Sequence, residues 1–210
     1  MAKAPVAGRV KTRLCPPFSP HDAAQLAAAA LHDTLAAVAA TACVRRVLAL
    51  DGAPGPWSPV GFEVLPQPAG GLDVRIAAVL QASKGPTLVI GMDTPQVTPT
   101  LLDSALAQLR DGSDAVIGPA QDGGYWLLGL SDPVPGAVVG VPMSASCTGA
   151  AQRERLHSLG LRTAVLPTLR DVDTADDAHA VAALVPSSRF ATLHRNIARR
   201  RARAPHPMSA

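Results

Sequence analysis

Short apolar runs alternate with helix-like segments along most of this 210-residue chain. The runs at 44–50, 87–91 and 114–120 lack a helical period and are bounded by Gly, Pro or Asp. Runs of this kind predict strands, and the continuous apolar run at 87–91 predicts a central strand covered on both faces. Aromatic residues make up only 3% of the chain, so Ala, Val and Leu must build the interior. The alternation therefore predicts an α/β fold, a three-layer sandwich around a mainly parallel sheet.

Capping residues mark where the longest helices begin. Ser19-Pro20-x-Asp22 predicts the start of an Ala-rich helix that runs to about Thr41. Thr174-x-x-Asp177 forms a capping-box pattern for a helix that ends near residue 184. The other predicted elements are helices at 72–83, 98–111 and 144–158 and strands at 62–65, 125–130 and 163–166.

The C-terminal segment differs from the rest of the chain in charge. Six arginines and no acidic residue follow position 184, so the remainder carries a net charge of −3 although the total is +3. The basic pI thus belongs to the tail and gives no reason to expect nucleic-acid binding. Phe190, Leu193 and Ile197 recur at helical spacing, which predicts a last helix docked on the domain, with 199–203 in solvent. We expect one domain at 1–185 and a basic helical tail at 186–210.

Several classes of protein are disfavoured by composition. The cysteines, Cys15, Cys43 and Cys147, are odd in number and far apart, which predicts neither disulfides nor a zinc site and fits a reducing compartment. No apolar run approaches the roughly 18 residues of a membrane span, and the N-terminus does not resemble a signal peptide. We expect a soluble, cytoplasmic protein.

The opening segment, 2–14, is cationic and contains residues that break regular structure. No acidic residue precedes Asp22, and Pro5 and Gly8 predict a loop whose backbone can approach a ligand closely. A cationic loop that leads into a helix suits a polyphosphate, although its spacing is not that of a Walker loop. A solvated basic loop is the alternative. The four basic residues are Lys3, Arg9, Lys11 and Arg13.

Carboxylates follow predicted strands at three places. Asp93 comes just after the strand at 87–91, where it could bind a hard cation such as Mg²⁺ or cap a turn. Asp122 precedes two glycines, for which a tight turn is the commoner reading. Asp171 and Asp173 lie two apart, so an extended chain puts both on one side, as a metal site or in a solvated loop.

Three further patterns could contact a ligand. Asp73 and Arg75 follow the Gly70-Gly71 turn, where they could bind a base or ribose or cap a helix. The small hydroxyls of 143–149 could meet a substrate or cap a helix. Tyr125 and Trp126 alternate along a strand, so we expect one of them in the core and the other near the ligand.

Four motifs occur in order: AKAPVAGRVKTRL, IGMDTP, IGPAQDGGYWLLGL and DVDTADD. Together they resemble the DUF2064 family, also called rSAM/selenodomain-associated transferase 1, within the nucleotide-diphospho-sugar transferase (GT-A) superfamily. The resemblance covers 2–184 and implies a Rossmann-like GT-A fold with a nucleotide site at the strand ends. The opening loop is similar to that of 2-phospho-lactate guanylyltransferases, and MobA-type guanylyltransferases share the fold. In both relatives an Asp before Pro binds the metal.

The resemblance implies roles for particular residues and Mg²⁺ or Mn²⁺ as cofactor. It makes Lys11, Arg13 and Asp93 catalytic, and it makes Asp93 and Asp173 the metal ligands. The expected nucleotide-binding residues are Ala2, Lys3, Ala4, Gly8, Arg9, Gly70, Gly71 and Arg75. The expected substrate-binding residues are Asp122, Gly123, Gly124, Tyr125 and Ser144.

Two departures from the family pattern concern the nucleotide site. Relatives carry several apolar residues of a first strand before AKAP, whereas this chain begins inside that strand. The usual GGDLGxR reads GGLDVR at 70–75, which separates Asp73 from its expected position.

Three functions are compatible with these features. A nucleotidyltransferase would use an NTP and a small phosphorylated acceptor, and positioning and charge stabilisation would carry the reaction without a covalent nucleophile. A glycosyltransferase would use a sugar nucleotide, but the sequence at Asp93 is DTP where such enzymes have D-x-D. A non-catalytic nucleotide-binding module is the third, disfavoured because a scaffold need not keep carboxylates opposite a cationic loop.

Overall fold

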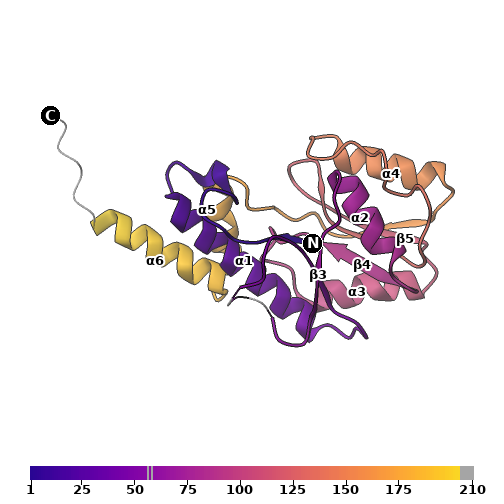
Figure 1. Cartoon of the computed structure of the whole chain (residues 1–210), viewed down its shortest axis with the longest axis horizontal. Coiled ribbons are helices and arrows are strands. Elements are labelled where there is room, and N and C mark those ends of the chain that lie inside the picture. Colours follow the sequence, from indigo (N-terminus) through magenta and orange to yellow (C-terminus); the bar gives the residue numbers. More distant parts are fainter. Residues whose placement is uncertain (56, 58, 204–210) are drawn as a thin grey trace.

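The computed structural model describes residues 1–203 except 56 and 58. Strands and helices alternate in the described chain, as the sequence predicts (Figure 1). The strands are β1 (Ala2–Lys3), β2 (Val47–Asp51), β3 (Glu63–Pro66), β4 (Thr87–Ile90), β5 (Ala115–Pro119), β6 (Tyr125–Leu130) and β7 (Thr163–Val165). The helices are η1 (Thr12–Leu14), α1 (Pro20–Ala40), α2 (Leu72–Gln81), α3 (Pro99–Arg110), α4 (Thr148–Ser158), α5 (Ala175–Leu184) and α6 (Arg189–Arg203).

Two sheets, ordered β1-β2-β3 and β4-β6-β5-β7, meet where β1 runs beside β4. The Met1 amino group donates to the Ile90 carbonyl (2.9 Å), and the Lys3 amide donates to the Met92 sulfur (3.2 Å). The partner on the second segment moves from residue 90 to residue 92 as the first moves from residue 1 to residue 3, so β1 is parallel to β4. Only β6 is antiparallel to its neighbours among the paired strands described. The mixed, mainly parallel sheet is therefore confirmed, and the carboxyl ends of the other strands share one edge.

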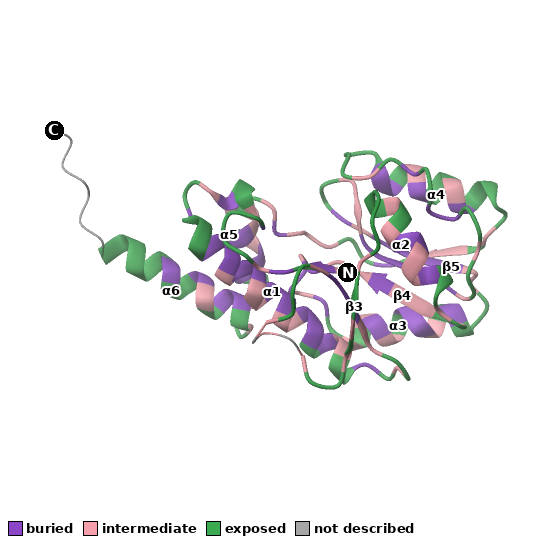
Figure 2. Ribbon diagram, viewed as in Figure 1, coloured by how far each residue is buried: buried purple, intermediate pink, exposed green. Residues whose placement is uncertain are grey.

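Helices cover both faces of the sheet, which confirms the three layers. Apolar side chains of α2 and α4 pack on one face with β4, β5 and β6. Those of α3 pack on the opposite face, and α1 covers β1 and β2. Helices α5 and α6 pack beyond α1 around a separate cluster that contains Leu14, Phe18 and Phe190. Figure 2 shows the buried residues along the sheet and along the contacting sides of these helices.

The predicted helix starts agree with the structure except at α4. Both capping boxes form, at Ser19/Asp22 and at Thr174/Asp177. Helix α4 begins at Thr148 and not at 144, because Ser144 has a left-handed φ of 57° that a right-handed helix cannot include. The Thr148 hydroxyl accepts a hydrogen bond from the Ala145 amide (3.1 Å).

Helix α1 combines length with an apolar composition. It is the one helix in the described residues that is long and apolar enough to cross a membrane, with a mean hydropathy of 1.3 in its most apolar window. Half of that window is buried inside the fold, against the sheet and α6. Packing in a protein core accounts for its composition. The three cysteines are free, as predicted.

The predicted last helix is present as α6, with Phe190 and Ile197 buried. Residues 199–203 are all exposed, as predicted, but two of the arginines also contact the domain. The Arg200 guanidinium pairs with Asp22, and that of Arg201 lies 5.5 Å from the centre of the Phe18 ring. Both contacts arise because α6 runs beside the start of α1. The predicted tail at 204–210, like positions 56 and 58 in the Pro/Gly-rich loop after β2, lies outside the described residues.

We expect truncation after Ala198 to lower the free energy of unfolding only modestly. It removes the ion pair between the exposed Arg200 and the buried Asp22, and one cation–π contact, each of which contributes on the order of 1 kcal/mol. Truncation before Arg189 should lower the free energy of unfolding far more, because it removes the buried Phe190 and Ile197 and exposes the side chains that they cover. Chemical denaturation of both truncations measures the difference. A large loss of nucleotide affinity after truncation at Ala198 would instead place the arginines at the ligand.

His194 makes the packing of α6 sensitive to acid. Its buried ring lies between Phe18, Phe190 and His179, and burial, followed by the charges of His179 and Arg195, lowers its pKa. The unfolded chain, with a His pKa of about 6.5, therefore takes up the proton first as the pH falls. The stability given by the neutral ring is complete above that pH and is lost as the pH falls through the folded-state pKa. In chemical denaturation at a series of pH values, the free energy of unfolding of the wild type should fall as the pH drops below about 6.5. His194→Gln should reduce that fall, whereas His157→Gln, at an exposed position, should not.

Candidate active site

Asp93 lies just past the carboxyl end of β4, as predicted, in a loop that is tied to the segment before α5. The Val172 amide donates to the Asp93 carbonyl (2.9 Å), and the Gln96 side-chain amide donates to the Arg170 carbonyl. The preceding residue, Leu169, lies beside the end of β5: its amide donates to the Pro119 carbonyl (3.0 Å), and its carbonyl accepts from the Gln121 amide (2.9 Å). These backbone contacts bring Asp93 close to the DVDT motif, which is distant from it in the sequence.

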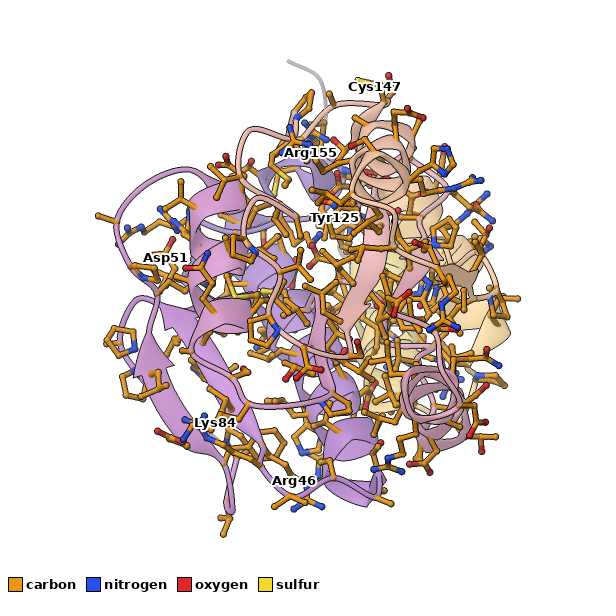
Figure 3. The ribbon with its side chains drawn as sticks, turned by 90° about the vertical axis from the view of Figure 1, so that its right-hand side faces the viewer. Arg46, Asp51, Lys84, Tyr125, Cys147 and Arg155 are labelled. Carbon is orange, nitrogen blue, oxygen red and sulfur yellow. The ribbon has the colours of Figure 1, made fainter. Side chains whose placement is uncertain are left out.

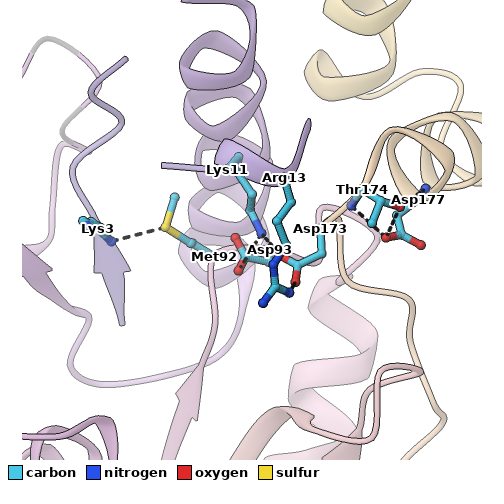
Figure 4. Close-up of polar contacts among 8 residues, drawn as sticks. All are labelled: Lys3, Lys11, Arg13, Met92, Asp93, Asp173, Thr174 and Asp177. Atoms are coloured by element: carbon cyan, nitrogen blue, oxygen red, sulfur yellow. Dashed lines mark hydrogen bonds and ion pairs between the residues drawn. The ribbon is translucent and has the colours of Figure 1, made fainter. Parts of the chain in front are cut away.

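Lys11 joins the two carboxylates that the resemblance assigns to a metal (Figure 4). Its Nζ lies 2.9 Å from Oδ2 of Asp93 and 3.0 Å from Oδ1 of Asp173. The second oxygen of Asp173 accepts a hydrogen bond from Nη1 of Arg13 (2.8 Å). Three predicted catalytic residues and both predicted metal ligands are thus brought into one cluster of direct contacts.

The local conformation of the opening loop aims Lys11 into this cluster. Lys11 has a left-handed φ of 48°, and the one-turn helix η1 that follows it is anchored by the fully buried Leu14. The Lys11 side chain is only 9% exposed, whereas that of Arg13 is 75% exposed. Lys11 therefore belongs to the interior of the cluster and Arg13 to its solvent side.

Charges set the protonation of the cluster. Burial acts to lower the pKa of Lys11, but Asp93 and Asp173 outweigh it and raise that pKa above its usual value. Burial acts to raise the pKa of Asp173, but Lys11 and Arg13 outweigh it and hold that pKa below its usual range. Burial, followed by the charges of Asp122 and Asp173, raises the pKa of Asp171 to about 6. Asp122 and Asp171 are thus also close enough for their charges to interact.

The cluster can offer a divalent cation two carboxylates. Asp93 keeps one oxygen, Oδ1, that is buried and has no hydrogen-bond partner, as a carboxylate awaiting a ligand would. The residues described contain no group of three His, Cys, Asp or Glu side chains placed to hold a metal. Mg²⁺ suits such a site, because it is usually held by one or two carboxylates with water and substrate phosphates as further ligands.

The turn at Asp122, Gly123 and Gly124 packs against the start of α4. Oδ1 of Asp122 accepts the Gly124 amide (2.7 Å), which is the predicted tight turn. Gly123 has a φ of +89°, and a Cβ there would lie 1.9 Å from the Ser146 carbonyl oxygen. The Gly149 amide donates to the Gly123 carbonyl (2.8 Å). The glycines therefore allow the close approach of two backbones, and Asp122 stays near Asp171.

Arg75 forms a second polar group, at the end of β2, with two residues that the sequence analysis missed. Its guanidinium donates to the Gly70 carbonyl (2.9 Å), to Gln67 Oε1 (3.2 Å) and to Asp51 Oδ2 (3.3 Å). The side-chain Nε2 of Gln67 in turn donates to the carbonyls of Ala2 and Ala49. Asp51 could have been found from its position directly after the predicted strand at 44–50, as Asp93 was found after the strand at 87–91. This group holds the Gly70-Gly71 turn beside the opening strand.

Tyr125 and Ser144 lie on a third part of the same edge. Because β6 is antiparallel, its first residue, Tyr125, is near the carboxyl end of β5. The Tyr125 hydroxyl lies 3.8 Å from the Met143 sulfur, and burial, followed by the charge of Asp73, raises its pKa. Asp73 accepts the Gly140 amide (2.9 Å), so it fixes this loop. Figure 3 shows Tyr125 near the centre of the view, below Cys147 at the top, and Ser144 is exposed.

The other predicted nucleotide-binding residues border these groups. Ala2 and Ala4 are buried, and the Ala4 amide donates to the Asp51 carbonyl (2.8 Å). Gly8 has a φ of +76°, which lets the loop turn toward Lys11. Lys3 and Arg9 are exposed. The structure thus places the predicted residues around one edge of the sheet in separate groups: the lysine, arginine and aspartate cluster, Arg75 with Gly70, and the Asp122 turn.

Solved structures with the same fold define the class. A protein from Desulfovibrio desulfuricans G20, provisionally classed as a nucleotide-diphospho-sugar transferase, superimposes with a TM-score of 0.84 at 24% identity over 92% of this chain and 91% of its own. The 2-C-methyl-D-erythritol 4-phosphate cytidylyltransferase of Thermus thermophilus gives a TM-score of 0.56 at 19% identity, over 88% and 98%. Rv0371c of Mycobacterium tuberculosis H37Rv, solved with manganese, gives 0.51 at 22%, over 86% and 95%. The fold is that of the nucleotide-diphospho-sugar transferases.

Within this fold class the family is also clear. The profile of DUF2064, described as uncharacterized proteins conserved in bacteria, matches residues 23–145, which is more than half of the chain. The chain belongs to the DUF2064 family, as its motifs suggested. The matched range contains Asp93 and Asp122, whereas Lys11, Arg13 and Asp173 lie outside it. No curated protein matches the chain.

Proposed function

We propose that this protein is a metal-dependent nucleotidyltransferase that acts on an NTP and a small phosphorylated acceptor. The observation that carries the proposal is the convergence of Lys11 and Arg13 on Asp93 and Asp173 at the carboxyl edge of the sheet. Cations and carboxylates in direct contact suit a ligand that combines phosphates with a divalent metal. The three free cysteines support a reducing, cytoplasmic setting.

The reaction requires positioning and charge stabilisation. An oxygen of the acceptor phosphate attacks the α-phosphorus, a new P–O bond forms, and the bond to the β-phosphate oxygen breaks, which releases pyrophosphate. Negative charge builds on the leaving pyrophosphate, where the Lys11 and Arg13 side chains would stabilise it. The Gly70-Gly71 turn, held by Arg75, and the loop at Asp122 would orient the two substrates. No covalent enzyme intermediate is involved.

The metal requirement follows from the donor set. Asp93 and Asp173 would hold Mg²⁺ or Mn²⁺, and the bound ion would neutralise phosphate charge. The unpartnered Oδ1 of Asp93 supports this assignment. The manganese complex of Rv0371c, a protein of the same fold, supports a divalent ion as well.

Pyrophosphate release tests the proposal directly. Each of the common NTPs would be incubated with Mg²⁺ or Mn²⁺ and a panel of small phosphorylated acceptors, and pyrophosphate and the nucleotidylated product would be measured together. We expect release that depends on one NTP, one class of acceptor and the metal. Pyrophosphate release in no combination would contradict nucleotidyl transfer.

Glycosyl transfer is the second candidate, favoured by the provisional class of the Desulfovibrio protein. In that case a sugar nucleotide would replace the NTP and its sugar would pass to the acceptor. The same panel with UDP- and GDP-sugars separates the two, since the product is then a free nucleoside diphosphate.

A further inference from the structure

We infer that the Lys11 ammonium is an internal cation that occupies the divalent-metal position between Asp93 and Asp173 until metal and nucleotide bind together. The inference rests on the proposed function, because it concerns the same two carboxylates. It adds a specific consequence, which is that the metal on its own must compete with a side chain of the protein.

The contacts of Lys11 are those expected of a bridging cation. One nitrogen contacts an oxygen from each carboxylate, at 2.9 and 3.0 Å, and its side chain is 9% exposed. Two carboxylates this close to one another repel unless a cation lies between them. Lys11 supplies that cation from a left-handed backbone conformation, which non-glycine residues seldom adopt, so the loop is arranged to hold it there.

Asp93 and Asp173 depend on Lys11 to different degrees. Asp173 has a second cation, Arg13, on its other oxygen. Among the described residues, Lys11 is the ion-pair partner of Asp93. The other carboxylate oxygen of Asp93, Oδ1, is buried and has no hydrogen-bond partner. A metal ion bound to both carboxylates would displace the ammonium, since both cations need the same oxygens. The displaced ammonium would then need a new anion close by.

The phosphates of a nucleotide can be that anion. In their absence, metal binding leaves a buried ammonium without a partner, which opposes binding. In their presence, the ammonium moves from carboxylate to phosphate while the metal takes its place. Metal and nucleotide therefore bind cooperatively, and each must raise the affinity for the other by the same factor.

Mn²⁺ alone, followed by EPR of the free ion, tests this without turnover. We expect Lys11→Met to bind Mn²⁺ at least about tenfold more tightly than the wild type when no nucleotide is present, which corresponds to about 1.4 kcal/mol. Lys84→Met removes the same charge from an exposed position before β4, at the opposite end of that strand from Asp93, so it should bind Mn²⁺ like the wild type. Adding Asp93→Asn to Lys11→Met should abolish the gain and so locate the ion.

A measurement on the wild-type chain guards against a variant that does not fold. The chain has three lysines, Lys3, Lys11 and Lys84, which peptide mass spectrometry separates after brief acylation. Lys11 should be labelled several-fold faster with saturating Mn²⁺ alone than without metal, because the displaced ammonium then has no anionic partner, and adding the NTP mixture should slow its labelling again. The rate at Lys84, which lies outside the cluster, should not change.

The outcomes separate this inference from the proposed function. Equal Mn²⁺ affinity in Lys11→Met and the wild type, or unchanged Lys11 labelling, overturns the competition between lysine and metal. Metal-dependent pyrophosphate release by the wild type would still support nucleotidyl transfer in that case. Tight Mn²⁺ binding by Lys11→Met without any pyrophosphate release by the wild type would instead support the role of Lys11 as an internal cation and contradict nucleotidyl transfer.

Discussion

Asp93→Asn should abolish metal-dependent nucleotide binding while the fold survives. The substitution removes the charge that Lys11 and the proposed metal share, and it leaves the backbone contact from Val172 to the Asp93 carbonyl intact. It also takes away half of the negative charge that Asp93 and Asp173 together would offer Mg²⁺, and with it the buried, unpartnered carboxylate oxygen. Nucleotide titrations with and without Mg²⁺ measure the effect. The wild type should show a large difference between the two conditions and the variant none.

The matched control for this variant is Asp132→Asn, which removes the same charge from an exposed position after β6. It should keep the full metal dependence. If Asp93→Asn also kept it, Asp93 would have no part in the metal site. Circular dichroism and thermal melting of both variants show whether the fold is retained.

Lys11→Ala and Arg13→Ala should each weaken NTP binding at least about tenfold in the presence of metal. A charge-assisted contact to a phosphate contributes on the order of 1.5–3 kcal/mol when well placed, and about 1.4 kcal/mol corresponds to a factor of ten. Both side chains already contact carboxylate oxygens of Asp173 in the free protein, so they are placed to contact phosphate oxygens of a ligand bound there. Calorimetric titration with each NTP gives the affinities.

The same variants distinguish the two proposed reactions. A triphosphate offers one phosphate more than a sugar nucleotide, so the losses should be larger for NTPs than for UDP- or GDP-sugars. Arg153→Ala, on the exposed side of α4, should change neither affinity. Tighter binding of sugar nucleotides than of every NTP by the wild type, without pyrophosphate release, would favour glycosyl transfer.

Lys11→Ala has a further use because it should have opposite effects on two ligands. The variant lacks a phosphate partner, so NTP binding weakens, and it lacks the internal cation, so Mn²⁺ alone binds more tightly. A merely misfolded site would lose both affinities. This crossed pattern therefore distinguishes a specific role of the lysine from general damage.

Local sequence signals determined most of the secondary structure. Capping boxes at Ser19 and Thr174 determine where two helices begin. Apolar runs locate the strands even when it is not known which strands pair with each other. The same signals located Asp93, since a carboxylate after a buried parallel strand must lie at one edge of the sheet. They failed at α4, where the left-handed backbone at Ser144 delays the helix and no residue type announces it.

Only the tertiary structure decided which charges meet. Lys11 and Asp173 are 162 positions apart, and Arg200 and Asp22 are 178 apart. Such pairs depend on the placement of β1 beside β4 and of α6 beside α1, which no local pattern encodes. The sequence predicted the cationic loop as a phosphate site and the carboxylates as a metal site, each on its own. That one lysine joins them in the free protein follows from chain geometry, because two loops and a backbone turn must place three side chains in contact at 2.9 and 3.0 Å.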